Sequence, residues 1–150
     1  MSSGSTGTEL PLELRARALW AAVVIPPWLA VSSFQRVASR LGRGSRPARS
    51  PSTPAEDAAL AAFVDSILHR LPGPWRHTCL KRAAVLFHVL RRADRPVQLL
   101  IGVRREADGA LQAHAWLARE GEVYLEPNPD VPPRHVVLAR FPDERDSHAA

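Results

Sequence analysis

Residues 75–103 read WRHTCLKRAAVLFHVLRRADRPVQLLIGV, and this stretch decides the fold. After Thr78 the apolar side chains recur at helical spacing, and the Leu-Arg-Arg end suits the negative end of a helix dipole. Next comes VQLLIGV (97–103), a short run of branched apolar residues that is typical of a buried strand. The stretch therefore predicts a helix that opens near Thr78 and a buried strand after it. The solvent-facing side of this helix is expected to carry Arg82, Arg91 and Arg92.

Another helix is predicted upstream by the segment TPAE at 53–56. Its threonine is a good cap, its proline suits the first helical position, and its glutamate can complete a capping box. Apolar residues follow at helical spacing as far as Leu71, and Pro72-Gly73-Pro74 should end the helix.

Downstream, short strand-like runs alternate with turns. The runs at 111–118 and 122–126 predict a hairpin, and the run at 135–141 predicts an edge strand after a proline-rich loop. Because the helices come first and the antiparallel strands follow, the pattern indicates an α+β domain. The chain is thereby divided into a segment at 1–52, the domain at 53–145 and a tail at 146–150.

The first segment is expected to contain two apolar helices. It begins with small polar residues that should be disordered (1–8) and ends in a linker rich in Gly, Pro, Ser and Arg (42–54). Between them the sequence predicts helices at 12–25 and 27–41, hinged at the prolines 26 and 27.

An uncharged run of 18 residues extends from Ala18 to Gln35 between two arginines. This length only just reaches what a membrane span needs, and two prolines interrupt the run. A soluble helical pair is therefore favoured over contact with a membrane surface or a partner, and over secretion or spanning. We expect a cytoplasmic protein, with attachment to the inner membrane surface as the alternative.

Composition excludes several classes of protein. The chain has 150 residues, 45% of them hydrophobic and 23% charged, so it can bury a core. A single cysteine excludes an internal disulfide and any zinc site that needs two thiolates. P-loop, zincin and Rossmann motifs are absent from the sequence, so neither a cofactor nor a metal is expected. The net charge of +5 suits an acidic peptide, whereas the arginine-rich segments lack the interleaved aromatic residues of a nucleic-acid site.

The single cysteine is the first candidate for chemistry. Cys79 should occupy the first position of the helix that opens at Thr78, where unpaired backbone N–H groups favour a thiolate. His114 lies between two alanines in a predicted strand and is the candidate base. A buried structural cysteine and a core histidine are the simpler alternative. The remaining histidines are expected in surface or structural positions, at helix ends or without an obvious partner: His69, His77, His88, His135 and His148.

The third group of a triad depends on the turn between the two hairpin strands. A three-residue loop Arg119-Glu120-Gly121 would place His114 opposite Glu126, close enough for the carboxylate to orient the imidazole. A two-residue turn would instead move Glu126 to the other face of the sheet. Asp130, four residues later, is the fallback acid.

Residues 75–103 and AHAWLAREGEVYLEPNPDV (113–131) together resemble the transglutaminase-like domain of lasso peptide B proteins, the leader peptidases of ribosomally made lasso peptides. The shared features are a Cys-Leu that opens a helix, a strand closing in Ile-Gly-Val, the Ala-His-Ala-Trp motif and an acid twelve residues after the histidine. The resemblance covers residues 53–145 well and the N-terminal apolar helices less specifically. It implies a papain-like core in which helices pack on a small antiparallel sheet.

The resemblance also implies an activity, which is removal of the leader from the precursor by a cysteine protease of the bacterial cytoplasm. Cys79 matches the family's nucleophile and His114 its base, while Glu126 stands where the family usually has Asp. The backbone N–H of Cys79 is the candidate oxyanion donor. A small leader-recognition protein and a cyclase are the implied partners. The alternatives are a non-catalytic scaffold that presents the precursor, or a related amidase or acyl transferase.

Overall fold

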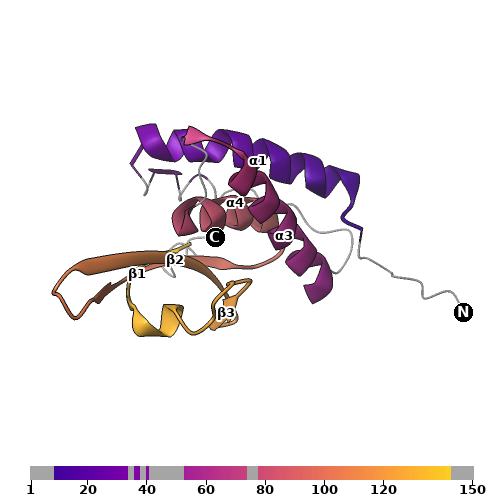
Figure 1. Ribbon diagram of the computed structural model, residues 1–150. Helices are drawn as coiled ribbons and strands as arrows, with labels where there is room; N and C mark the ends of the chain where they lie inside the picture. Colours follow the sequence, from indigo (N-terminus) through magenta and orange to yellow (C-terminus); the bar gives the residue numbers. More distant parts are fainter. Residues whose placement is uncertain (1–8, 34–35, 38–39, 41–52, 74–77, 143–150) are drawn as a thin grey trace, which may run out of the picture.

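The computed structural model describes residues 9–33, 36–37, 40, 53–73 and 78–142. Figure 1 shows them as stacked layers, with the helices on one side of a single sheet. The central helix packs against both the outermost helix and the sheet. The outermost helix is α1 (Leu12–Val31). It packs directly on both α3 (Pro54–Arg70) and the central α4 (Cys79–Arg92).

The sheet is antiparallel, with strand order β3-β2-β1-β4. This arrangement confirms the predicted α+β class and places the last strand at an edge, as expected. One face of the sheet, which includes Leu99 and Leu117, packs against the helices. The other face carries Leu100 and Trp116 and lies on the side of a short 3-10 helix, η2 (Pro132–Arg134). The strands are β1 (Gln98–Arg105), β2 (Leu111–Arg119), β3 (Glu122–Tyr124) and β4 (Val136–Phe141).

Both predicted helix starts are confirmed by their caps. The hydroxyl of Thr53 accepts a hydrogen bond from the Glu56 N–H at 3.2 Å, and Pro54 is the first residue of α3. The hydroxyl of Thr78 accepts from the Lys81 N–H at 3.3 Å, so α4 begins at Cys79. Each cap supplies an acceptor for one of the N–H groups that a helix start leaves unpaired.

The solvent-facing side predicted for α4 is wrong at Arg82. Because α4 lies between α1 and the sheet, almost its whole circumference is covered, and residues 82–90 are all buried. Arg82 compensates for its burial by donating from Nε to Asp65 Oδ1 of α3 at 2.7 Å. His88, expected at an exposed position or a helix end, is also buried and packs against Trp20 of α1.

The predicted hinge at the two prolines is wrong as well. α1 is one helix of 20 residues that runs through Pro26 and Pro27 and ends at Val31. A proline inside a helix costs about 3 kcal/mol, because it removes a hydrogen bond and crowds the preceding turn. Here the helix stays continuous because its inner face, including Ile25 and Pro26, is buried in the core.

The larger of two buried hydrophobic clusters joins α1 to α3, α4 and the helix-facing side of the sheet. Leu14, Ala18 and Ile25 of α1 belong to the same buried cluster as Leu60 of α3 and Phe87 of α4. The division of the chain at residue 53 stays a prediction. The disordered start at 1–8, most of the linker at 42–54 and the tail at 146–150 lie outside the described residues.

Candidate active site

Cys79 is the first residue of α4, as the sequence predicts. Its thiol is free and partly exposed. The first N–H groups of a helix have no acceptor within the helix, so the backbone N–H of Cys79 is a candidate donor to a developing oxyanion.

His114 and Glu126 form the pair that the sequence predicts. The imidazole Nε2 lies 3.1 Å from Glu126 Oε1, and the two side chains are only 17% and 9% exposed. Within the described ranges, His114 Nδ1 makes no hydrogen bond, so it is the nitrogen available for proton transfer. Asp130, the fallback acid, is exposed on the following loop.

The route by which Glu126 reaches His114 differs from the predicted one. The hairpin has a two-residue turn, Glu120-Gly121, with both residues at positive φ, and its register pairs Leu117 with Tyr124. The predicted three-residue loop is therefore wrong. With strand geometry continued, Glu126 would lie on the wrong face. Leu125 instead adopts φ 54°, and this left-handed residue ends the strand and turns the next side chain back toward His114.

The hairpin that carries Glu126 is tied to α3 by a buried carboxylate. Asp57 is fully buried and accepts hydrogen bonds from Arg95 on one oxygen and from the Tyr124 hydroxyl on the other. Arg119 lies 3.5 Å from the same carboxylate. Burial, together with the bond to Asp57, raises the pKa of the Tyr124 phenol above its usual value of 10.0. The sequence analysis did not identify Asp57, although a charged residue on an apolar helix face was the available signal.

His135 is the second residue that the sequence analysis missed, because no partner was evident. It is buried, its ring centroid lies 5.5 Å from that of His114, and its Nδ1 lies 2.9 Å from the Val131 carbonyl oxygen. Trp116 stacks on His114 at 5.9 Å and 16°. A Cβ at Gly102 would lie 2.9 Å from atoms of both His135 and Trp116, so only glycine fits there. A glycine within a branched strand signals such a close approach.

A cavity of about 320 Å³ adjoins this cluster. It lies on the sheet face away from the helices, and His135 and Trp116, which both contact His114, form part of its wall. Its size suits a peptide side chain, and its walls carry charged residues, Glu122 and Arg140, beside apolar ones. Its further lining includes Leu100, Val123, Pro132 and Val137.

The structure does not join Cys79 to His114. α4 packs against the sheet face that carries Ala115 and Leu117, whereas His114 lies on the opposite face with Trp116. Among the described residues, no hydrogen bond connects the thiol to the imidazole. The same part of the chain contains no group of three or more His, Cys, Asp or Glu residues that could hold a metal ion.

Comparison with known proteins identifies one family. The sequence matches the transglutaminase-like superfamily over residues 20–138, a range that includes α3, α4, the strands β1, β2 and β3, the start of β4 and the second half of α1. No curated protein and no solved structure gives a match.

Proposed function

The chain belongs to the transglutaminase-like superfamily, and from this membership we propose that it is a cysteine peptidase with Cys79, His114 and Glu126 as its triad. The observation that carries the proposal is the His114–Glu126 contact of 3.1 Å. A carboxylate on one imidazole nitrogen holds the ring in place and leaves the other nitrogen for proton transfer. The position of Cys79 at the start of α4 supports its role as nucleophile.

The proposed reaction is hydrolysis of one peptide bond. The Cys79 thiolate attacks the carbonyl carbon, and the oxyanion accepts hydrogen bonds from backbone donors, among them the Cys79 N–H. The His114 imidazolium protonates the departing amine as the C–N bond breaks. A water molecule, deprotonated by the same imidazole, then attacks the thioester, releases the acid and restores the thiolate. Glu126 holds the ring throughout.

We propose the precursor of a ribosomally made lasso peptide as substrate, cut between leader and core. This part of the proposal is supported by the motifs of residues 75–103 and 113–131, which resemble lasso peptide B proteins. A small leader-recognition protein would deliver the leader, and a cyclase would act on the released core. The cavity beside His135 is a candidate subsite for a side chain of the precursor. The reaction would take place in the bacterial cytoplasm.

The proposal includes a conformational step. Cys79 and His114 belong to opposite sides of the sheet layer, and catalysis requires the sulfur within hydrogen-bonding reach of His114 Nδ1. Catalytic contacts often tighten only when substrate is bound. We therefore expect binding of the precursor and its recognition partner to bring the thiol and the imidazole together.

The decisive experiment reconstitutes the full chain with its precursor and leader-recognition partner and measures products by mass spectrometry. Cys79→Ala should abolish cleavage and leave the melting temperature unchanged, because the thiol is partly exposed and makes no buried polar contact among the described residues. His69→Ala, which alters an exposed histidine on α3, is the control and should cleave at the normal rate. Full cleavage by Cys79→Ala would refute the peptidase assignment.

A second candidate is a non-catalytic scaffold that presents the precursor. The observation in its favour is the placement of the cavity and His114 on the sheet face opposite α4. A thiol-reactive probe distinguishes the two functions. A peptidase requires Cys79 to react faster when precursor and partner are added, whereas a scaffold leaves its reactivity unchanged. A related amidase or acyl transferase would give a new adduct in place of two hydrolysed peptides.

A further inference from the structure

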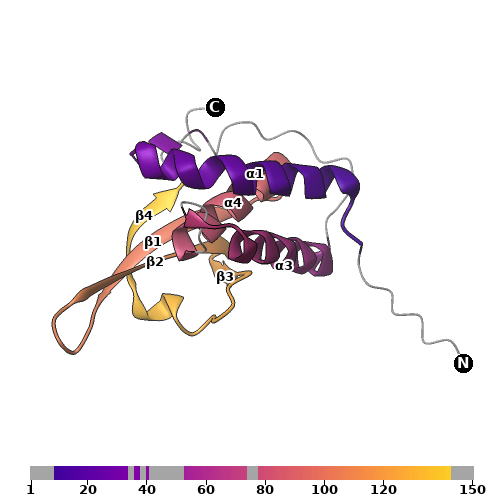
Figure 2. The same cartoon turned by 45° about the horizontal axis from the view of Figure 1, so that its top comes forward.

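The outward face of α1 is apolar from Leu19 to its end at Val31, whereas the first turns of the helix expose Glu13 and Arg15. Figures 1 and 2 show α1 across the outside of α3 and α4, so this face is directed away from both helices. Its side chains follow helical spacing and include a tryptophan that is 57% exposed. Monomeric soluble proteins rarely expose a continuous apolar patch of this kind unless it binds something. The exposed large apolar side chains of α1 are Leu12, Leu19, Trp20, Val23, Val24 and Val31.

The inward face of the same helix is buried. Leu14, Ala18, Ala21, Ala22 and Ile25 pack against α3 and α4, so half of the helix circumference belongs to the protein core. α1 is long and apolar enough to cross a membrane by length and composition alone. Because its inner face is committed to the core, any contact with a bilayer would use only the outer face.

The charge of the surrounding sequence identifies the kind of surface that this face fits. Residues 14–55 contain seven arginines and no acidic residue, whereas the other residues carry thirteen basic and fifteen acidic side chains. Arg15, Arg36 and Arg40 are exposed at the two ends of the apolar stretch. A cluster of four to eight basic residues beside an apolar helix is typical of binding to anionic lipid, worth about 1 kcal/mol per residue near the surface.

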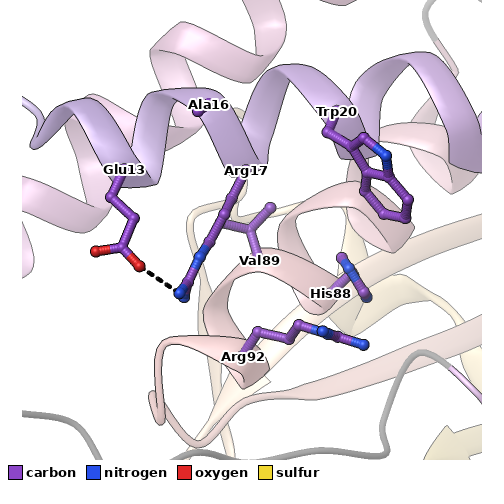
Figure 3. A pocket seen from close by; sticks show the side chains of 7 residues that line it. All are labelled: Glu13, Ala16, Arg17, Trp20, His88, Val89 and Arg92. Carbon is purple, nitrogen blue, oxygen red and sulfur yellow. Dashed lines mark hydrogen bonds and ion pairs between the residues drawn. The ribbon is translucent and has the colours of Figure 1, made fainter.

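A cavity of about 450 Å³ adjoins the apolar face between α1 and α4. Figure 3 shows Arg17 of α1 and Arg92 of α4 bordering it, with Trp20 and His88 on another side. Arg17 is paired with Glu13 at 2.5 Å, whereas Arg92 is exposed in the last turn of α4. Two guanidinium groups beside a tryptophan suit a phosphate at the level of lipid headgroups.

We propose that α1 attaches the protein to the surface of an anionic phospholipid bilayer. Its outer face enters the boundary between headgroups and acyl chains, and the flanking arginines, with Arg92, bind headgroup phosphates. The helix lies in the plane of the membrane and does not span it. This attachment does not involve Cys79, His114 or Glu126, so it is independent of the proposed peptidase activity.

Flotation with vesicles tests the proposal on the full chain. The protein should float with vesicles of phosphatidylcholine and phosphatidylglycerol, bind phosphatidylcholine alone far more weakly, and dissociate at high salt. Leu19→Gln should weaken binding about tenfold, as expected for the loss of one buried leucine. Arg92→Gln should weaken binding to the anionic vesicles about fivefold, and only to them.

Leu111→Gln is the matched control, because Leu111 is an equally large and 67% exposed leucine that lies on β2, far from α1 in sequence. This variant should bind vesicles normally, and Leu19→Gln should keep its melting temperature and its cleavage rate in solution. No binding of the folded chain to anionic vesicles would overturn the proposal. So would an equal loss from Leu111→Gln, or a dimer that Leu19→Gln dissociates, which would assign the face to a second copy of the chain.

Discussion

Asp57 and Glu126 are two carboxylates that contact the hairpin of β2 and β3, Asp57 at Tyr124 and Glu126 at His114. Their surroundings differ. Asp57 is fully buried and saturated, with Arg95, Arg119 and the Tyr124 hydroxyl around its two oxygens. Among the described residues, Glu126 pairs with the His114 imidazole, and the cavity is lined by two neighbours of that ring, Trp116 and His135. The donors around Asp57 compensate for the burial of its charge, whereas Glu126 contacts the imidazole of His114.

This difference separates a structural carboxylate, Asp57, from the carboxylate of the proposed triad, Glu126. A buried charge is tolerated only when several donors satisfy it, and removal of one member of such a set leaves the others uncompensated. A carboxylate that pairs with a histidine contributes little to folding, yet it holds the orientation of that ring. Substitutions at the two positions should therefore separate stability from activity.

The largest effect is expected for Asp57→Ala. It leaves the buried Arg95 guanidinium with Glu56 as its remaining carboxylate and removes the acceptor of the Tyr124 hydroxyl, so the free energy of unfolding should fall by about 3 kcal/mol. The melting temperature should then fall by about 10 °C, measured by calorimetry. Glu13→Ala, which removes the exposed partner of Arg17, should cost under about 1 kcal/mol. Equal losses for the two variants would contradict the structural role of Asp57.

Glu126→Gln should show the reverse pattern. Leader cleavage should fall about 10²–10³-fold, because an amide holds the imidazole in place poorly and does not stabilise its protonated form. The melting temperature should change little. Asp130→Asn should cleave normally, since Asp130 is exposed on the loop. A severe loss from Asp130→Asn with little from Glu126→Gln would assign the third role to Asp130.

His135 tests whether the cluster around His114 positions the base. His135→Ala removes the ring that packs at 5.5 Å, so kcat should fall about tenfold, and KM should rise as well because His135 also lines the proposed subsite. His135→Phe restores a ring in the same place and should recover most of the rate. If the phenylalanine variant is as slow as the alanine variant, packing is not the role of His135.

The smallest effect is expected for Tyr124→Phe, about 1 kcal/mol of stability at neutral pH. Because the pKa of Tyr124 is raised in the folded chain, its contribution is complete below pH 10 and is lost as the pH rises through that raised value. The difference between the native chain and Tyr124→Phe should therefore shrink in alkaline solution, as measured by urea unfolding at several pH values. A difference that stays constant above pH 10 would contradict the buried phenol.

The sequence predicted that His114 and Glu126 are partners, but the turn that was expected to bring them together is different in the structure. The spacing of twelve residues in a hairpin was informative, but turn length and the backbone of Leu125 each change which face a side chain occupies. The two departures cancel for the side chain of Glu126. The two-residue turn would place it on the other face of the sheet, and the left-handed backbone of Leu125 turns it back toward His114. Leucine rarely adopts a positive φ, so the local sequence does not predict the φ of 54° at Leu125.

Local patterns also failed at α1 and α4 for a shared reason. The prolines in α1 and the arginine at position 82 follow rules for isolated helices, which predict a hinge and an exposed side chain. Burial of the inner face of α1 keeps the first helix straight, and Asp65 of α3 pairs with Arg82 inside the second. Both outcomes depend on neighbours that are distant in sequence.

The sequence by itself determined where the helices of the domain begin, the α+β order and the identity of the candidate nucleophile, base and acid. These features depend on caps, side-chain periodicity and chemical type, which are properties of short segments. Only the tertiary structure decided that Asp57 is satisfied in the core, that His135 packs on His114, and that α1 turns an apolar face outward. Each of these depends on which surfaces meet, because burial and hydrogen-bond satisfaction are set by the packing of segments far apart in the chain.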